Sequence, residues 1–176
     1  MHANVKKILV IGCSGGGKST LTRALSEKLN LPPIHLDMHF WQPNWTETPA
    51  DEWHKKISKL IKADKWVMDG TFSSSFNLRF PVADKIIFLN LPTILCLWRA
   101  ITRVFKYSRK SSRPDMALGC HEKMDLDFYK YIWTFKRKIN PQIEEAIIKH
   151  DCRSKVVELN SDSEVKNFLK SLQNSV

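Results

Sequence analysis

Short apolar runs alternate with longer amphipathic stretches along the chain. A continuous apolar run bounded by glycine, asparagine or charged residues predicts a strand that is covered on both faces of a sheet. Such runs occupy Lys7–Ile11, Pro33–Asp37, Trp66–Met68, Lys85–Asn90 and Lys155–Leu159. Five strands separated by helical stretches predict an α/β fold with a five-stranded, mainly parallel sheet and helices on both faces.

Between the strands, apolar residues recur at helical spacing. Thr48–Asp51 and Ser161–Glu164 resemble capping boxes that begin two of the helices, and Asn140–Pro141 predicts a kink or a break. The strongest apolar stripe follows Pro92, on a helix whose opposite, polar side carries two arginines. This stripe consists of Ile94, Leu97, Trp98, Ile101, Val104 and Phe105.

The segment after the first strand reads GCSGGGKST and matches the pattern G-x-x-x-x-G-K-[ST] at every fixed position. Glycines let the backbone curl with its N–H groups facing inward, and the helix that follows adds unpaired donors and the positive end of its dipole. The segment therefore predicts a polyphosphate site. We expect Lys18 to reach the β- and γ-phosphates of ATP and the Ser19 hydroxyl to bind Mg²⁺. The residues predicted to bind ATP here are Gly12, Cys13, Ser14, Gly15, Gly16, Gly17, Lys18, Ser19 and Thr20.

Two carboxylates end predicted strands at the same edge of the sheet, where ligands of such sheets bind. Asp69 follows Trp66–Met68, and Asp37 closes the second strand. We interpret Asp69 as a catalytic residue that holds Mg²⁺ through water and helps to position the substrate, and Asp37 as a substrate contact. A role as ordinary strand-end carboxylates stays open for both. The strand Lys85–Asn90 ends in asparagine, which argues against motor, helicase and transporter ATPases.

Two further side chains are candidates for substrate binding. We expect Trp41 either to stack on a substrate or to seal a loop against the core. We expect Arg79 either to hold an anionic group of the substrate or to lie at the surface. His35, Asp37 and His39 alternate as metal ligands do on a strand, although no further ligand is evident, and we interpret them as ordinary strand and loop side chains.

The chain is basic, with 28 Lys and Arg against 18 Asp and Glu and a net charge of +10. Arg99–Lys138 alone carries +7. Such a run is typical either of a solvated face or of a site for polyanions. Because Arg99 and Arg103 share a helix face, we interpret them, together with Arg137, as catalytic groups around a transferred phosphoryl group. The basic, glycine- and serine-containing loop that follows, Tyr107–Gly119, would close over this group and exclude water.

The order of these motifs resembles that of the adenylate-kinase-related small-molecule kinases, and most closely the family named for DNA topology modulation proteins. The resemblance implies a P-loop kinase fold with ATP on the glycine-rich loop. It also implies an adenine contact near Arg99, Asn160 and Ser161, and a small basic lid at about 104–127. Arg103 and Arg137 would then stabilise charge. The matching residues are Gly12–Thr20, Leu36–Asp37, Trp41, Pro43, Trp45, Lys65–Gly70, Ala83–Asn90, Leu91–Pro92, Arg99, Arg103, Trp133, Arg137 and Pro141.

The sequence Asp69–Phe72 departs from the Asp-Gly-Phe-Pro-Arg typical of nucleoside monophosphate kinases, which argues against AMP as the acceptor. We therefore predict an ATP- and Mg²⁺-dependent phosphotransferase that moves the γ-phosphoryl group of ATP to a small acceptor. The alternatives are a nucleic-acid-binding NTPase or regulator that affects DNA topology, and a nucleotide-binding regulator without catalysis. Nucleic acid is the less favoured partner because we find no recognition helix, zinc finger or aromatic RNA-binding motif.

The remaining features predict one P-loop kinase-like domain over 1–176 in a cytoplasmic monomer. No apolar run approaches the roughly 20 residues that cross a bilayer, and we expect no membrane contact. The four cysteines have no CxxC spacing, and we expect them to be reduced thiols without disulfides.

Overall fold

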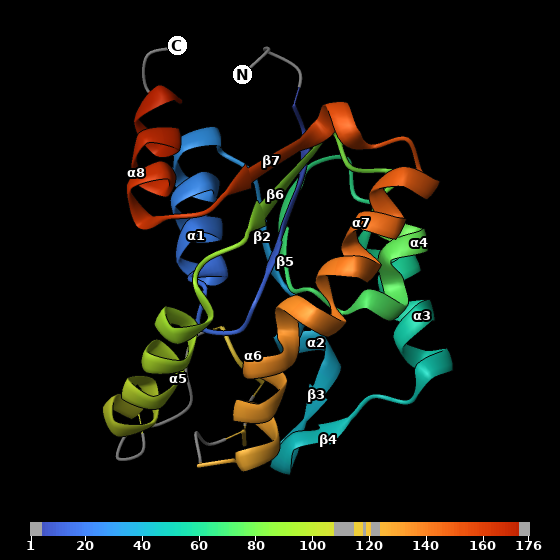
Figure 1. Ribbon diagram of the computed structural model, residues 1–176. Coiled ribbons are helices and arrows are strands. Elements are labelled where there is room, and N and C mark those ends of the chain that lie inside the picture. Colours follow the sequence, from blue (N-terminus) through green and yellow to red (C-terminus); the bar gives the residue numbers. More distant parts are fainter. Residues whose placement is uncertain (1–4, 108–114, 118, 121–123, 173–176) are drawn as a thin grey trace.

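The computed structural model describes residues 5–107, 115–117, 119–120 and 124–172. Within these residues, five strands form a parallel sheet in the order β2-β5-β1-β6-β7 (Figure 1). The strands are β1 (Lys7–Gly12), β2 (Pro33–His35), β5 (Trp66–Asp69), β6 (Lys85–Leu89) and β7 (Val156–Leu159). The predicted α/β architecture with a five-stranded parallel sheet is confirmed.

Helices cover both faces of this sheet, as Figure 1 shows. Ile8 and Val10 of β1 face a core formed with α1 and α8, whereas Leu9 and Ile11 face the other core, formed with α3 to α7. No helix of the described residues is long and apolar enough to cross a membrane. The helices are α1 (Lys18–Leu29), α2 (Leu36–Phe40), α3 (Ala50–Leu60), α4 (Phe76–Arg79), α5 (Thr93–Tyr107), α6 (Leu126–Lys138), α7 (Asn140–Lys149) and α8 (Asp162–Ser171).

The second strand is shorter than predicted. It ends at His35, and helix α2 follows where Asp37 was expected to extend the strand. The edge strand β2 pairs only with β5, and its last partner is Asp69, where β5 also ends. The next residue, Gly70, donates its N–H to the Val10 carbonyl at 3.2 Å on the β1 side of β5. A small antiparallel hairpin of β3 (Trp41–Gln42) and β4 (Thr46–Glu47), not predicted from the sequence, follows α2.

The predicted helix ends are correct in two cases and wrong in one. Ser161 caps α8 by accepting the N–H of Glu164 at 3.2 Å, and α6 ends just before Asn140, so that the predicted cap and break are confirmed. Thr48 does not cap α3, which begins after Pro49 with no side-chain cap. Its hydroxyl instead donates to the Phe40 carbonyl at 2.6 Å and ties the end of α2 to the start of α3.

Helix α5 is rotated relative to the expectation from its apolar stripe. Its buried residues are Cys96, Ala100 and Val104, whereas Trp98 and Phe105 are exposed. The side of the helix that carries the arginines turns inward, because both arginines find partners there. Arg99 pairs with Asp162 of α8, and the Arg103 guanidinium lies 5.7 Å from the centre of the Phe128 ring of α6.

Arg79 is fully buried and holds the loop that follows β5. Its guanidinium donates to the carbonyls of Gly70 at 2.8 Å, of Phe72 at 3.0 Å and of Thr71, and its Nε donates to the Ser75 hydroxyl at 3.0 Å. Burial lowers the pKa of Arg79 to about 9. Its donors therefore satisfy a turn of backbone whose carbonyls point inward, away from water.

Replacing Arg79 with leucine leaves these buried carbonyls without donors. We expect the free energy of unfolding to fall by about 3–5 kcal/mol. Arg153→Leu is the matched control, because Arg153 pairs with Glu144 at the surface and should contribute less than about 1 kcal/mol. Urea denaturation of both variants measures the difference. Equal losses in the two variants would contradict the role given to Arg79.

Candidate nucleotide site

The glycine-rich loop between β1 and α1 is wedged against two neighbouring backbones. A side chain at Gly12 would place its Cβ 2.4 Å from the Leu89 carbonyl oxygen at the end of β6. A side chain at Gly15 would place it 2.2 Å from the Cys96 carbonyl oxygen at the start of α5. Both glycines also have positive φ values, 143° and 80°. The pattern of glycines thus serves both the curl of the loop and its close packing.

Thr71 fixes the start of this loop. Its hydroxyl accepts the N–H of Gly12 at 3.0 Å and donates to the Gly12 carbonyl at 2.7 Å. Sequence reasoning did not assign Thr71 a function. Thr71 lies two residues after the end of β5, and β5 pairs with β1. This position could have indicated that its hydroxyl lies next to the glycine-rich loop.

The start of α1 has the features of an anion site. Gly17 caps the helix without a side-chain acceptor, and the first turn contains no acidic residue. Among the described residues, neither a cap side chain nor an acidic residue of the first turn therefore neutralises the positive end of the α1 dipole. Lys18 adds a charge at the same point, and its Nζ donates to the Cys13 carbonyl at 3.1 Å across the loop. Ser19 follows in the first turn.

Three cations converge on the start of α5 beside the loop. The Cys96 pKa is lowered to about 7 by a hydrogen bond from the Cys13 thiol and by the charges of Lys18, Arg99 and Lys136. The Cys13 pKa is raised by the same contact and by burial. The positive potential at this end of the sheet therefore comes from three separate helices, α1, α5 and α6.

Arg99 lies beside the turn that follows β7, next to the residues that the family resemblance groups with it for an adenine contact. Its Nη2 donates to the Asp162 carboxylate at 2.6 Å. The N–H of Asn160 donates to the Glu164 carboxylate at 2.9 Å, and Ser161 forms the cap of α8. Contact of these residues with a nucleotide stays a prediction.

Asp69 is buried and engaged by a histidine. His35 Nδ1 and Asp69 Oδ2 are 2.7 Å apart, at positions that pair between β2 and β5. The hydrogen bond with Asp69 raises the pKa of His35, and burial opposes it. Sequence reasoning weighed His35 as a metal ligand, interpreted it as an ordinary strand side chain, and did not pair it with Asp69. That alternation on a strand does not occur, because Asp37 lies in α2, and the described residues hold no cluster of three or more metal-ligating side chains.

Helix α6 brings two further groups to the loop. The Tyr131 pKa is raised by burial and by its proximity to Cys13 and Asp37. Cys13 Sγ also lies 3.9 Å from the Ile132 carbonyl oxygen. The predicted catalytic residue Arg137 is exposed on the same helix. Tyr131 was not predicted, because its position on a helix face gives no local sign of what lies opposite.

The remaining predicted substrate residues belong to the scaffold. Trp41 packs edge-on against Phe40 and Trp45, with ring centres 4.9 and 5.4 Å apart. These contacts support the interpretation of Trp41 as a seal of the hairpin. The expectation that Arg79 lies at the surface is wrong, because its side chain is fully buried. Its donors are used by buried carbonyls, which argues against the predicted contact with an anionic substrate.

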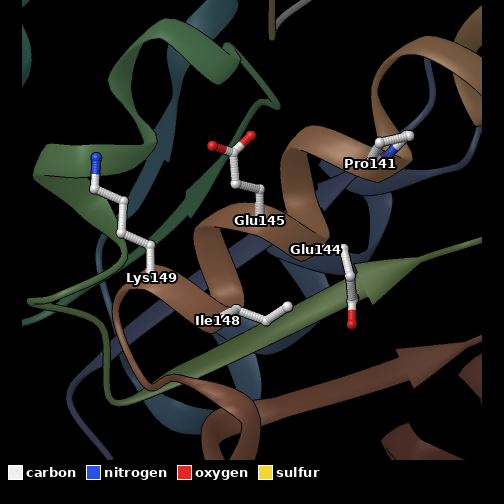
Figure 2. Close-up of a pocket in the computed structure, with 5 residues that line it drawn as sticks. All are labelled: Pro141, Glu144, Glu145, Ile148 and Lys149. Carbon is white, nitrogen blue, oxygen red and sulfur yellow. The ribbon is translucent and has the colours of Figure 1, made fainter.

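The predicted lid at 104–127 lies partly outside the described residues. Its described part includes Gly119, whose carbonyl accepts the N–H of Asn44 at 3.2 Å, and Cys120, whose thiol donates to Gln42. This segment therefore contacts the β3–β4 hairpin. A pocket on α7 lies elsewhere and does not involve the glycine-rich loop; it is lined by Pro141, Glu144, Glu145, Ile148 and Lys149 (Figure 2).

The fold matches that of solved structures of P-loop kinases. A shikimate kinase from Bacteroides thetaiotaomicron superposes with a TM-score of 0.62 at 18% identity, over 97% of this chain and 98% of that one. A shikimate kinase from Acinetobacter baumannii in complex with shikimate superposes with a TM-score of 0.59 at 16% identity. The superposition covers 98% of this chain and 96% of that one. A deoxyadenosine kinase from M. mycoides superposes with a TM-score of 0.54 at 14% identity, over 96% of each chain.

Sequence comparison gives a shorter match. The uncharacterized protein YqaC of Bacillus subtilis (strain 168) is 30% identical over 103 residues, which span 57% of this chain and 58% of YqaC. The match thus covers less than two thirds of that relative. No family model matches the chain.

The pair of His35 and Asp69 predicts a pH dependence of stability. Because Asp69 raises the pKa of His35 above 6.5, the pair stabilises the fold fully below pH 6.5, and this stabilisation is lost as the pH rises through the raised pKa. The difference in free energy of unfolding between wild type and His35→Gln should therefore shrink on going to alkaline pH. Urea denaturation at a series of pH values measures it.

His39 provides the opposite control. Burial and the charge of Lys56 lower its pKa, so that its neutral form is the one the fold favours. The stability difference between wild type and His39→Gln should therefore grow as the pH rises toward 6.5. If the stability differences of the two variants change with pH in the same direction, the stabilising pair of His35 and Asp69 is contradicted.

Proposed function

We propose that the protein is an ATP- and Mg²⁺-dependent phosphotransferase that acts on a small acceptor. The observation that carries the proposal is the start of α1, which has neither a capping side chain nor an acidic residue and lies where Lys18, Arg99 and Lys136 converge. Unpaired helix N–H groups with converging cations favour a polyphosphate. The fold is shared with shikimate and deoxyadenosine kinases, which are small-molecule and nucleotide kinases.

Each basic residue has a proposed role in neutralising the γ-phosphoryl group. Lys18 binds the β- and γ-phosphates, and its present acceptor, the Cys13 carbonyl, is a weaker partner than a phosphate oxygen. Arg99, beside Asn160 and Ser161, binds the adenosine side of the nucleotide. Arg103 and Arg137 complete the charge stabilisation as the lid closes and excludes water.

The oxygen donors near the loop fit Mg²⁺. Mg²⁺ prefers hard oxygen ligands and keeps several waters. The Ser19 hydroxyl and, through water, the Asp69 carboxylate would hold it, and the ion would neutralise phosphate charge there. Asp69 is only 2% exposed, so its interaction with an ion competes directly with His35.

The acceptor is proposed to bind between α2 and α6. Asp37 and Asp69 would position its hydroxyl group. The charge of Asp37 also raises the pKa of Tyr131 on α6. Because Arg79 is committed to the scaffold, it does not provide a cation for an anionic acceptor. An uncharged, hydroxylated acceptor therefore fits these residues better than a nucleoside monophosphate.

The adenylate-kinase-related subclass and the DNA topology modulation family remain part of this proposal. A nucleic-acid-binding function needs cations that face outward along a groove. Arg99 and Lys136 instead hydrogen-bond to Asp162 and to the Asn90 carbonyl. These contacts favour a nucleotide over a nucleic acid as the polyanion bound at this edge.

Replacing Lys18 with methionine tests the phosphate site. We expect ATP turnover to fall at least about 100-fold while the melting temperature stays unchanged, because the lysine acts on charge that develops in the transition state. Lys149→Met, on α7, is the control and should keep full turnover. ADP release in a coupled assay measures both variants.

The acceptor is tested with a panel of nucleosides, nucleoside monophosphates, hydroxylated acids and sugars. A supported proposal shows ADP release that depends on the acceptor and exceeds background hydrolysis. If supercoiled DNA stimulates turnover and no small acceptor does, the phosphotransferase proposal is wrong and the nucleic-acid alternative replaces it.

A further inference from the structure

One side of α5 carries large apolar side chains that are exposed. Ile94, Trp98, Ile101 and Phe105 are 74%, 61%, 37% and 73% exposed, and we call these four residues the α5 stripe. The opposite side of the helix is buried. Contiguous exposed apolar patches on a folded chain mark interaction surfaces.

The chain offers little to cover the α5 stripe. In Figure 1, α5 lies at the margin of the molecule, where α6 packs against it from one side. Within the described part of the chain, no element covers the four side chains, which are all exposed.

The spacing of the α5 stripe is self-complementary. Its members are 4, 3 and 4 residues apart, the alternation of a and d positions in a coiled coil. This spacing is symmetric about the point midway between Trp98 and Ile101. When two copies of α5 pair antiparallel about a two-fold axis at that point, Trp98 meets Ile101 of the partner subunit. Ile94 then meets Phe105 of the partner subunit, so that each aromatic ring packs on an isoleucine.

The charges around the α5 stripe favour a second copy over a lipid or nucleic-acid surface. The residues that flank the stripe are uncharged: Leu95, Leu97, Thr102 and Val104. Like charges therefore do not meet across the pairing. Arg99 turns toward Asp162, Arg103 lies over Phe128, and Lys106 lies over the ring of the adjacent tyrosine. A surface for anionic headgroups or phosphates has its cations along the edge of the apolar face instead.

We propose that the α5 stripe is the interface of a two-fold symmetric homodimer with antiparallel α5 helices. This replaces the expectation of a monomer and goes beyond the phosphotransferase activity, on which it does not depend. Each copy contributes on the order of 500 Å², less than the roughly 800 Å² per partner of a standard interface. The dimer therefore dissociates on dilution.

Sedimentation equilibrium of the full chain over a range of concentrations tests the dimer. We expect the mass of two chains at high concentration and of one chain on dilution. The double variant Trp98→Gln with Phe105→Gln should raise the dissociation constant at least about tenfold. Ile148→Gln, at a site 70% exposed on α7, is the matched control and should leave it unchanged. Equal melting temperatures show that the variants fold.

Charge swaps test the antiparallel register. Trp98→Lys and Ile101→Glu should each weaken the dimer alone, and mixing the two variants should restore it, because lysine and glutamate then face each other. Mixing Trp98→Lys with Phe105→Glu should not restore it. Restoration in neither mixture, or equally in both, overturns the register.

Two results overturn the interface itself. One is a dimer that the glutamine double variant does not weaken. The other is a chain that stays monomeric at all concentrations; if that chain sediments with phosphatidylglycerol vesicles only while the α5 stripe is intact, a lipid surface is the occupant instead.

Discussion

The close backbone contact of the glycine-rich loop with its neighbours is the constraint on which the rest of the site depends. Gly12 lies against Leu89, Gly15 lies against Cys96, and both backbone groups of Gly12 bond to Thr71. A direct contact between two backbone segments fixes their distance, because no side chain lies between them that could change its conformation. The ends of β5 and β6 and the start of α5 are therefore fixed relative to the loop.

This constraint also organises the charges. Each cation that converges on the loop already has a protein acceptor: a carbonyl for Lys18, a carboxylate for Arg99 and a carbonyl for Lys136. Two of these acceptors are neutral, so a phosphate can compete for the cations at little cost while their positions stay defined. Electrostatic preorganisation of this kind lowers the reorganisation that a developing charge would otherwise demand.

The parts of the fold that the sequence predicts are those with local signals. The loop motif and the apolar runs of β1 and β6 can be predicted from the sequence. The loop needs glycines at fixed spacing, and the buried strands need consecutive apolar residues. The end of β2 depends on where β5 stops, and the burial of Arg79 depends on which carbonyls the following turn directs inward. These are properties of paired segments, and a single sequence stretch does not contain them.

Helix α5 shows why an apolar stripe alone does not identify the core-facing side. Two contacts fix the rotation of the helix. The Cys96 carbonyl packs against the backbone of Gly15, and Arg99 forms a salt bridge with Asp162. Turning the α5 stripe inward would carry Arg99 away from α8 and lift Cys96 off the loop. The contacts of the glycine-rich loop and of α8 therefore require that the apolar side faces outward. Exposure of that side is unfavourable in water, and association of two copies offsets it without disturbing the inner side of the helix.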